Sequence, residues 1–258
     1  MKAVILAGGF GTRLAEETEI RPKPMVEIGG RPILWHIMKH YSSHGIDDFI
    51  ICLGYKSEYI KKFFLDYSQT LSDFTVDLST QKIEVHKQRA ENWRITLIDT
   101  GIYTMTGGRI KRALQHISPK ENFCLTYGDG LSDVDITASI DFHNKHGKMA
   151  TVTAVTPPGR FGILDINESN EVTGFREKIA SDQYRINGGD FVLNSNIDSV
   201  INGDSSIWEH EPMQKLAHTK ELIAWNHDGF WQPMDTLRDK RLLEEIWENG
   251  KPPWRTKC

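Results

Sequence analysis

Three apolar runs in this sequence each end directly in glycine, and this pattern constrains the fold more than any other feature. The runs cover residues 2–7, 47–53 and 122–127, and they end at Gly8, Gly54 and Gly128. Short apolar runs bounded by turn residues are typical of buried strands, and glycine lets a backbone turn sharply or approach a ligand closely. We therefore expect buried strands whose glycine-marked ends lie together at one edge of a sheet.

Segments with helical character separate the predicted strands. Helices are expected at 32–45, 57–67, 107–117 and 136–147. Further strands are expected within 72–100 and at 149–155 and 187–195, with a hairpin at 162–178. Strands that alternate with helices build a mostly parallel sheet covered on both faces. The sequence therefore predicts an α/β fold in one domain over 1–258, completed by helices at about 205–258.

Composition narrows the class of partner. The formal net charge is −4, whereas proteins that bind nucleic-acid backbones are more often basic. No apolar run approaches the roughly 18–20 residues of a membrane span, and the apolar start of the chain is too short for a signal peptide. The three cysteines show no disulfide or zinc spacing. We expect a cytoplasmic protein with no nucleic-acid or membrane partner. If the protein binds a phosphate, we expect it to do so at a local cluster of positive charge.

The segment LAGGFGTRL, residues 6–14, combines glycines with a hydroxyl and a cation. It is no P-loop, because no Gly-Lys-Ser/Thr follows, and Leu14 occupies the third position of a partial G-x-G-x-x-G pattern. One interpretation is a loop whose backbone N–H groups face a triphosphate, with Arg13 as a charge clamp. The other interpretation is a tight turn from strand to helix.

Lys23 lies between two prolines in RPKPMVEIGGRPIL, residues 21–34. Proline restricts both its own backbone and that of the residue before it, so we expect a stiff, extended segment. A lysine on such a segment can be placed on a ligand at little further entropic cost. An isolated lysine of this kind would more often be a solvated loop residue.

Two aspartates are candidates for a metal site. Asp129 is projected between glycines at the end of the strand 122–127, where a carboxylate is a good Mg²⁺ ligand. Asp235 could add a second carboxylate, although its position before TLRDKRLLEEIW favours a helix N-cap. An aspartate in a glycine turn is also common without any metal. Asp133 and Asp135 stand at a helix start and are expected to cap it.

Two groups of side chains are interpreted as structural. His36, His40 and His44 fall on one stripe of the predicted helix, but without a carboxylate between them they indicate a polar helix face rather than a metal site. Trp247 and Trp254, near the end of the chain, are expected to pack a tail or a subunit contact.

Five ordered motifs carry a resemblance that covers nearly the whole chain. They are LAGGFGTRL, RPKPMVEIGGRPIL, YGDG, REK and NGGDFVL. In this order they resemble the sugar-1-phosphate nucleotidyltransferases. The resemblance implies a Rossmann-like α/β fold with a mostly parallel mixed sheet flanked by helices, the nucleotidyltransferase fold. It also implies a nucleoside triphosphate, Mg²⁺, a sugar-binding hairpin at about 160–195, and a homo-oligomer for which the tryptophan-rich tail is a candidate contact.

Further stretches are most similar to family members that use CTP and glucose 1-phosphate. These are PILWHIMKHYSSHGIDDFIICLGY, DTGIYTMTGGRIKR, TYGDGLSDVDI, PPGRFGILDI and GFWQPMDTLRDKRLLEEIWENGKPPW. The implied products are CDP-glucose and pyrophosphate, and CDP-glucose supplies 3,6-dideoxyhexose synthesis for the O-antigen of bacterial lipopolysaccharide. A related uridylyl-, thymidylyl- or guanylyltransferase and a non-catalytic sugar-nucleotide sensor are the alternatives.

The resemblance also implies roles for individual residues. The residues implied to bind the nucleotide are Leu6, Ala7, Gly8, Gly9, Gly11, Thr12, Arg13, Lys23, Thr104, Arg109 and Gly128. Those implied to face the sugar phosphate are Glu177, Lys178 and Asn187. Asp129 and Asp235 would hold Mg²⁺, and Arg13, Lys23 and Asp129 would carry catalysis. One departure stands out, because Ile179 occupies a position where the family usually has proline.

Overall fold

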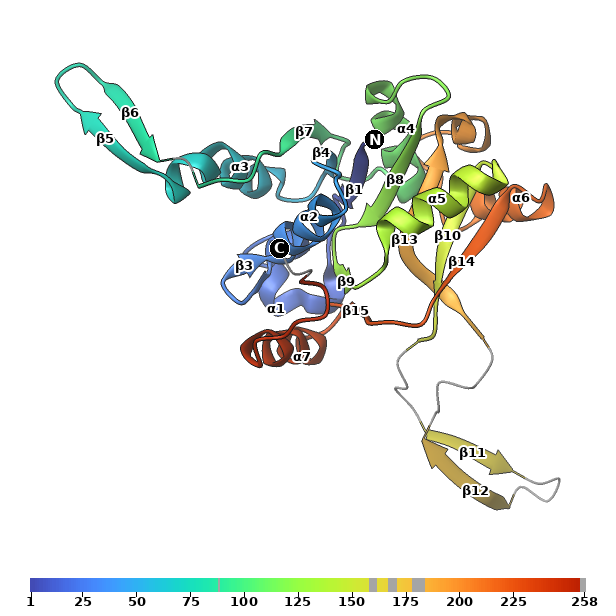
Figure 1. Ribbon diagram of the computed structural model, residues 1–258. Coiled ribbons are helices and arrows are strands. Elements are labelled where there is room, and N and C mark those ends of the chain that lie inside the picture. Colours follow the sequence, from blue (N-terminus) through green and yellow to red (C-terminus); the bar gives the residue numbers. More distant parts are fainter. Residues whose placement is uncertain (88, 158–161, 167–170, 178–183, 256–258) are drawn as a thin grey trace.

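A twisted sheet of seven strands forms the centre of the protein (Figure 1). The computed structural model describes residues 1–87, 89–157, 162–166, 171–177 and 184–255, and only the backbone within 162–166 and 174–177. From one edge to the other the sheet consists of β14 (Leu222–His227), β10 (Ala150–Val155), β13 (Ile186–Asn194), β8 (Asn122–Tyr127), β1 (Ala3–Ala7), β4 (Asp48–Leu53) and β7 (Arg94–Asp99).

The sheet is mostly parallel, as predicted. β1 runs parallel to both neighbours, with Ile5 opposite Ile51 in β4 and Thr126 in β8. Among the described strands of this sheet β13 alone is antiparallel to its neighbours, pairing with β8 and β10. The carboxyl ends of β1, β4 and β8 therefore lie at one edge, so the predicted meeting of Gly8, Gly54 and Gly128 is confirmed.

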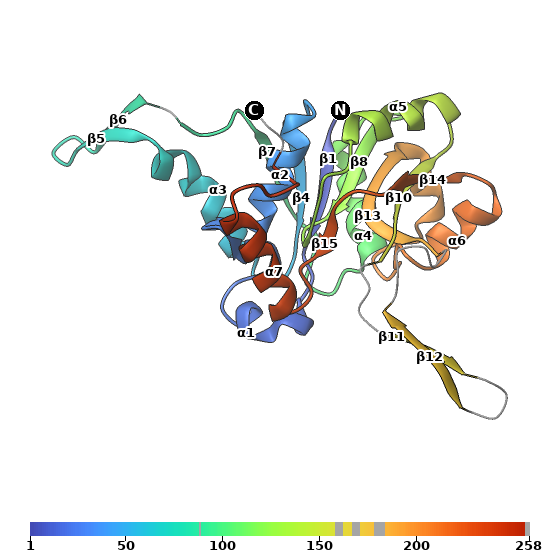
Figure 2. The same cartoon turned by 60° about the horizontal axis from the view of Figure 1, so that its bottom comes forward.

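Helices cover both faces of the sheet (Figure 2). They are α1 (Ala15–Thr18), α2 (Ile33–Ser43), α3 (Ser57–Leu71), α4 (Thr106–Ala113), α5 (Ile136–His146), α6 (Glu211–His218) and α7 (Leu237–Glu248). Alternate residues of β1 point to opposite faces. Ile5 packs in one core with α2 and α7, and Val4 packs in the other with α4 and α6.

Four small two-stranded sheets complete the fold. They pair β2 (Glu27–Ile28) with β3 (Arg31–Pro32), β5 (Asp73–Asp77) with β6 (Lys82–Lys87), β9 (Gly130–Ser132) with β15 (Trp231–Pro233), and β11 (Gly162–Ile166) with β12 (Val172–Glu177). The β5–β6 and β11–β12 hairpins extend away from the central sheet in both views (Figures 1 and 2). Every residue of β5 and β6 is exposed.

Three expectations about elements need correction. The region 205–258 holds α6 and α7, but strands β14 and β15 lie between them, so it is not helical throughout. The helix expected at 57–67 extends to Leu71 as α3, and Lys56, which precedes it, has a left-handed φ of 50°. The stripe of histidines is no solvated face, because His36 and His40 are buried and each bonds a backbone carbonyl.

The expectations for Asp135 and for the tryptophans of the tail are confirmed. Asp135 caps α5 by accepting a hydrogen bond from the N–H of Ala138 at 2.9 Å. Trp254 is buried, and both it and Trp247 pack against the His36 ring of the same chain. No helix in the part of the chain that the structure describes is both long and apolar enough to cross a membrane.

Candidate active site

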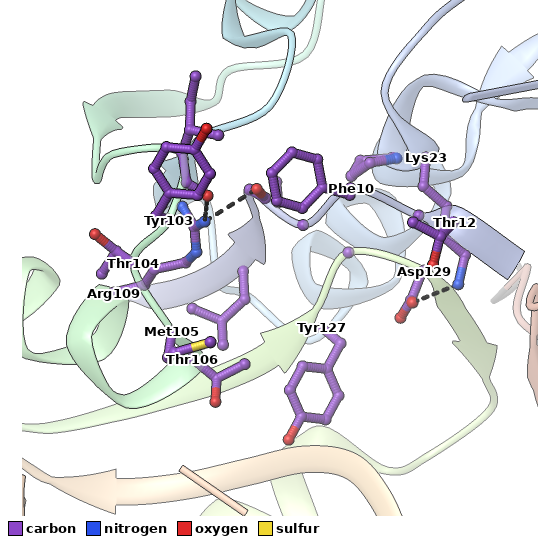
Figure 3. A pocket seen from close by; sticks show the side chains of 18 of the residues that line it. Phe10, Thr12, Lys23, Tyr103, Thr104, Met105, Thr106, Arg109, Tyr127 and Asp129 are labelled. Atoms are coloured by element: carbon purple, nitrogen blue, oxygen red, sulfur yellow. Dashed lines mark hydrogen bonds and ion pairs between the residues drawn. The ribbon is translucent and has the colours of Figure 1, made fainter. Parts of the chain in front are cut away.

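A pocket of about 430 Å³ opens at the carboxyl ends of β1 and β8 (Figure 3). This volume lies within the roughly 300–1,000 Å³ of typical small-molecule sites. The residues implied to bind the nucleotide all lie in its wall, together with Asp129, an implied metal ligand. They are Leu6, Ala7, Gly8, Gly9, Gly11, Thr12, Arg13, Lys23, Thr104, Arg109, Gly128 and Asp129.

Lys23 lies at the centre of a chain of alternating charges beside this pocket. Its Nζ is 2.7 Å from Asp129 Oδ2 and 2.8 Å from Asp235 Oδ1. Asp235 also accepts a hydrogen bond from Arg13, with Nη1 and Oδ2 2.7 Å apart. Segments that are more than a hundred residues apart in sequence thus converge on one ammonium group.

The two aspartates keep Lys23 charged. Burial by itself lowers the pKa of this lysine, but the charges and hydrogen bonds of Asp129 and Asp235 together outweigh burial and raise the pKa above its usual value. The ammonium is therefore positive throughout the neutral pH range. A fixed cation buried beside a pocket suits an anionic ligand such as a phosphate.

Local structure positions each member of this charge chain. Lys23 begins a 3₁₀ turn over Lys23–Met25, so the expected extended conformation is wrong at this residue, although Pro22 before it is extended. The carbonyl of Asp129 accepts a hydrogen bond from the N–H of Met234 at 2.8 Å, which joins the two carboxylate segments.

Asp235 is not the helix cap that its position favoured. Thr236 caps α7 instead, in a capping box with Asp239. The Asp235 carboxylate is therefore held by Lys23 and Arg13 rather than by the start of the helix. An aspartate directly before a capping-box threonine is a sequence signal that could have favoured the site role.

The carboxylates of Asp129 and Asp235 fit Mg²⁺ as a partial ligand set. In the described residues no cluster of three or more acidic, histidine or cysteine side chains forms a complete metal cage. Mg²⁺ is usually bound by one or two carboxylates, with water and substrate phosphates completing its coordination. Two carboxylates that converge beside a phosphate-sized pocket match that pattern.

Arg109 lines the pocket, but its guanidinium is committed to the protein. It donates to the carbonyls of Leu53 at 2.9 Å, Gly8 at 3.0 Å and Ile102 at 3.3 Å, and to the Thr100 hydroxyl at 2.6 Å. Burial lowers the pKa of this arginine. The guanidinium thus joins the ends of β1, β4 and β7, and its predicted contact with a nucleotide stays a prediction.

The glycines of the loop serve different purposes. A Cβ at Gly8 would lie 2.0 Å from Arg109 Nη1, so this glycine makes room for the arginine. Gly11 has a left-handed φ of 64°, which favours glycine. A Cβ added at Gly9 would meet no atom within 4 Å. Of these three glycines, only Gly9 therefore has open space beside its backbone, where a ligand could lie.

We predict that Gly8→Ala destabilises the protein and Gly9→Ala does not. The new methyl group at residue 8 must displace a guanidinium held by four hydrogen bonds, which should cost about 1–3 kcal/mol of unfolding free energy. Thermal denaturation should show a melting temperature lowered by roughly 3–10 °C for Gly8→Ala. Equal melting temperatures for the two variants would contradict the role given to Gly8.

Exposed aromatic side chains at the pocket mouth escaped the sequence analysis. Phe10 and Tyr103 lie on the rim (Figure 3), and their ring centroids are 6.3 Å apart. The ring centroids of Phe10 and Tyr55 are 5.3 Å apart. Tyr103 is 86% exposed, which is unusual for a large aromatic side chain unless it meets a ligand or partner. The aromatic residue inside the glycine loop was the available sequence signal.

The predicted sugar-phosphate residues are described only in part. Asn187 lies at the start of β13, and its Oδ1 accepts a hydrogen bond from the N–H of Gly189 at 2.8 Å. Glu177 ends β12, where the backbone alone is described. Lys178, together with the unexpected Ile179, lies outside the described residues.

Asp190, a carboxylate within the buried strand β13, has hydroxyl partners. It accepts hydrogen bonds from Tyr41 at 2.8 Å and from Ser132 at 3.4 Å. Burial and the neighbouring Asp190 carboxylate raise the pKa of Tyr41, so the phenol stays a donor. The polar group is thereby satisfied inside the core.

Comparisons with known proteins place the whole chain beside nucleotidyltransferases. Residues 2–231 match the family described as "Nucleotidyl transferase". The chain is 58% identical to "Glucose-1-phosphate cytidylyltransferase" of Salmonella typhi, over 99% of both chains. It is 43% identical to "Probable glucose-1-phosphate cytidylyltransferase" of Bacillus subtilis, again over 99% of both.

A solved structure supports the same fold. The crystal structure of HddC from Yersinia pseudotuberculosis superposes with a TM-score of 0.70 at 25% identity, covering 95% of this chain and 99% of that one. The predicted α/β fold with a mostly parallel sheet is therefore confirmed. Sequence, architecture and pocket agree, and this chain belongs to the nucleotidyl transferase family.

Proposed function

We propose that this protein transfers the cytidylyl group of CTP to α-D-glucose 1-phosphate, giving CDP-glucose and pyrophosphate. The observation that carries the proposal is the charged Lys23, held by Asp129 and Asp235 beside a glycine-lined pocket. The 58% identity to a glucose-1-phosphate cytidylyltransferase over nearly the whole chain supports the choice of base and sugar.

The reaction is a displacement at the α-phosphorus of CTP. A phosphate oxygen of the sugar phosphate forms the new P–O bond, and the bond from the α-phosphorus to the bridging oxygen of pyrophosphate breaks. The attacking oxygen is already ionised near neutral pH, so no strong general base is required. Repulsion between two anions is the main obstacle, and positioning with charge neutralisation overcomes it.

Lys23 and Arg13 supply that neutralisation from the protein. Lys23 is held in place by two carboxylates, so its ammonium is preorganised before the substrate arrives. Arg13 is 71% exposed at its side chain, so it can reach toward the departing pyrophosphate. Asp129 and Asp235 would hold Mg²⁺, which when bound offsets phosphate charge. Lys178 and Asn187 are proposed to orient the sugar phosphate.

Phe10 and Tyr103 are proposed to cover the base. Aromatic side chains stack on bases with a gain of roughly 1–3 kcal/mol each, regardless of base identity. We predict that Phe10→Ala/Tyr103→Ala raises the KM for CTP about tenfold or more with little change in kcat. Tyr59→Ala, which removes an exposed aromatic ring from α3, is the matched control. Unchanged KM for CTP in the double variant would contradict this role.

The proposal extends to assembly as a homo-oligomer. The β5–β6 hairpin supports it, because Phe74, Val76, Ile83 and Val85 are large apolar side chains exposed on one projecting arm. The tryptophan-rich tail is a weaker candidate, because Trp247 and Trp254 pack against their own chain.

Pyrophosphate release with glucose 1-phosphate and Mg²⁺ tests the proposal across CTP, UTP, dTTP, GTP and ATP. We expect fast release with CTP, and product analysis should identify CDP-glucose. Fast release with another nucleotide and slow release with CTP would assign a different base. Nucleotide binding without release of pyrophosphate from any nucleotide would favour a sensor instead of an enzyme.

A further inference from the structure

A second pocket, larger than the first, lies between α2 and the end of the chain. Its volume is about 1,220 Å³. It is lined by Gly29, Arg31, Trp35, His36, Lys39, Ser42, Ser43, Trp247, Gly250, Lys251, Pro252, Pro253, Trp254 and Arg255, and we call it the α2–tail pocket. None of these residues lines the candidate active site.

The charge of the α2–tail pocket is positive throughout. Four of its lining residues are lysine or arginine, and none is aspartate or glutamate, although the chain as a whole has a net charge of −4. Lys39 is 3.4 Å from Glu91. For Arg31, Lys251 and Arg255, no carboxylate of the described residues forms an ion pair.

Two of the positively charged side chains lie against indole rings of this pocket. The Arg31 guanidinium lies 5.6 Å from the Trp35 ring, and the Arg255 guanidinium lies 5.6 Å from the Trp247 ring. Such contacts orient a guanidinium while leaving its N–H groups free to donate. The pocket therefore presents oriented phosphate donors beside indole rings.

The His36 ring fixes the aromatic wall. Its centroid is 4.9 Å from Trp247 and 6.2 Å from Trp254, and its Nε2 lies 2.8 Å from the Ile28 carbonyl. Burial, with help from the nearby Arg31 and Arg255, lowers the pKa of His36 to about 4. The ring stays neutral near pH 7, so the positive charge of the pocket comes from the arginines and lysines.

We propose that the α2–tail pocket is a second ligand site that binds a nucleoside phosphate, such as a nucleotide or nucleotide sugar. Guanidinium groups recognise phosphate oxygens in pairs, and indole rings stack on bases. The concave shape of the pocket suits a small molecule, and the net negative charge of the chain disfavours a polynucleotide.

Equilibrium dialysis of the full chain against labelled CDP-glucose tests this proposal. We expect the unmodified protein to bind two equivalents of CDP-glucose per chain. In Arg31→Ser/Arg255→Ser one equivalent should bind as before, and the other should bind at least tenfold more weakly. Arg94→Ser/Arg241→Ser removes two exposed arginines outside the pocket and should keep both equivalents. Circular dichroism checks folding, and Arg31→Lys/Arg255→Lys, which retains the charges, should keep part of the second affinity.

Several results would overturn the proposal. If the unmodified protein binds only one equivalent of CDP-glucose and Lys23→Ala weakens it, the α2–tail pocket does not bind this ligand. The same conclusion follows if Arg31→Ser/Arg255→Ser still binds two equivalents. Sedimentation is run in parallel, and loss of oligomer mass in the pocket variant would identify a second copy as the occupant. The inference depends on the proposed function only for the choice of probe. If that function is wrong, the equivalent sensitive to Lys23→Ala disappears while the one sensitive to Arg31 and Arg255 remains.

Discussion

Replacement of Lys23 by alanine should reduce kcat by roughly 30- to 1,000-fold. Loss of one preorganised donor to developing charge typically costs about 2–4 kcal/mol of transition-state stabilisation. The variant also leaves Asp129 and Asp235 facing each other without the ammonium between them. Steady-state kinetics with CTP and glucose 1-phosphate would measure the effect.

Lys111→Ala is the matched control for Lys23→Ala. Lys111 also bonds an aspartate, with its Nζ 2.9 Å from Asp198, but it lies outside the candidate active site. The control should keep nearly full kcat. If Lys23→Ala raised only the KM for glucose 1-phosphate and left kcat unchanged, Lys23 would be a substrate contact and not a group that stabilises the transition state.

Asp129→Asn should lower kcat by about 100-fold or more. The change keeps the shape of the side chain but removes a negative charge from the proposed Mg²⁺ ligand set, and metal ions contribute several kcal/mol to such transition states. It also removes one of the two carboxylates that raise the pKa of Lys23. The measurement is the rate of CDP-glucose formation over a series of Mg²⁺ concentrations.

Asp133→Asn provides the comparison for Asp129→Asn. This carboxylate follows four residues later and pairs with His227 at 3.1 Å, away from the pocket. Its removal should leave the Mg²⁺ dependence unchanged. Activity close to the unmodified level for Asp129→Asn in excess Mg²⁺ would rule out the metal role of Asp129.

Features that depend on local pattern could be predicted from the sequence. The strands around Ile5 and Ile51 are short apolar runs, and their type and their shared edge followed from these runs and from the glycines that end them. The α5 cap by Asp135 likewise depends on residues only three positions apart. The family motifs then grouped Lys23 and Asp129 before any geometry was known.

Features that depend on long-range packing could not be predicted in this way. Residue 8 has no room for a side chain because the Arg109 guanidinium occupies that space, and Arg109 lies about a hundred residues further along the chain. β14 lies in a region that was expected to be helical. The sequence did not reveal this strand, because its burial depends on its pairing with β10. His36 and His40 looked like a polar face, since nothing local indicates that Ile28 and Val134 offer them carbonyl partners.

The position of Arg109 changes what an approaching anion meets at the pocket. Backbone carbonyls of Leu53, Gly8 and Ile102 are the negative ends of peptide dipoles, and they lie around the same edge as the pocket. Without a nearby positive charge, these dipole ends would disfavour a triphosphate at this edge, even though Leu53 also accepts from Thr100 and Gly8 from Tyr55. The Arg109 guanidinium donates to all three carbonyls and adds a positive charge beside them. This edge of the pocket therefore tolerates a polyanion. The arginine can therefore favour nucleotide affinity without touching the nucleotide.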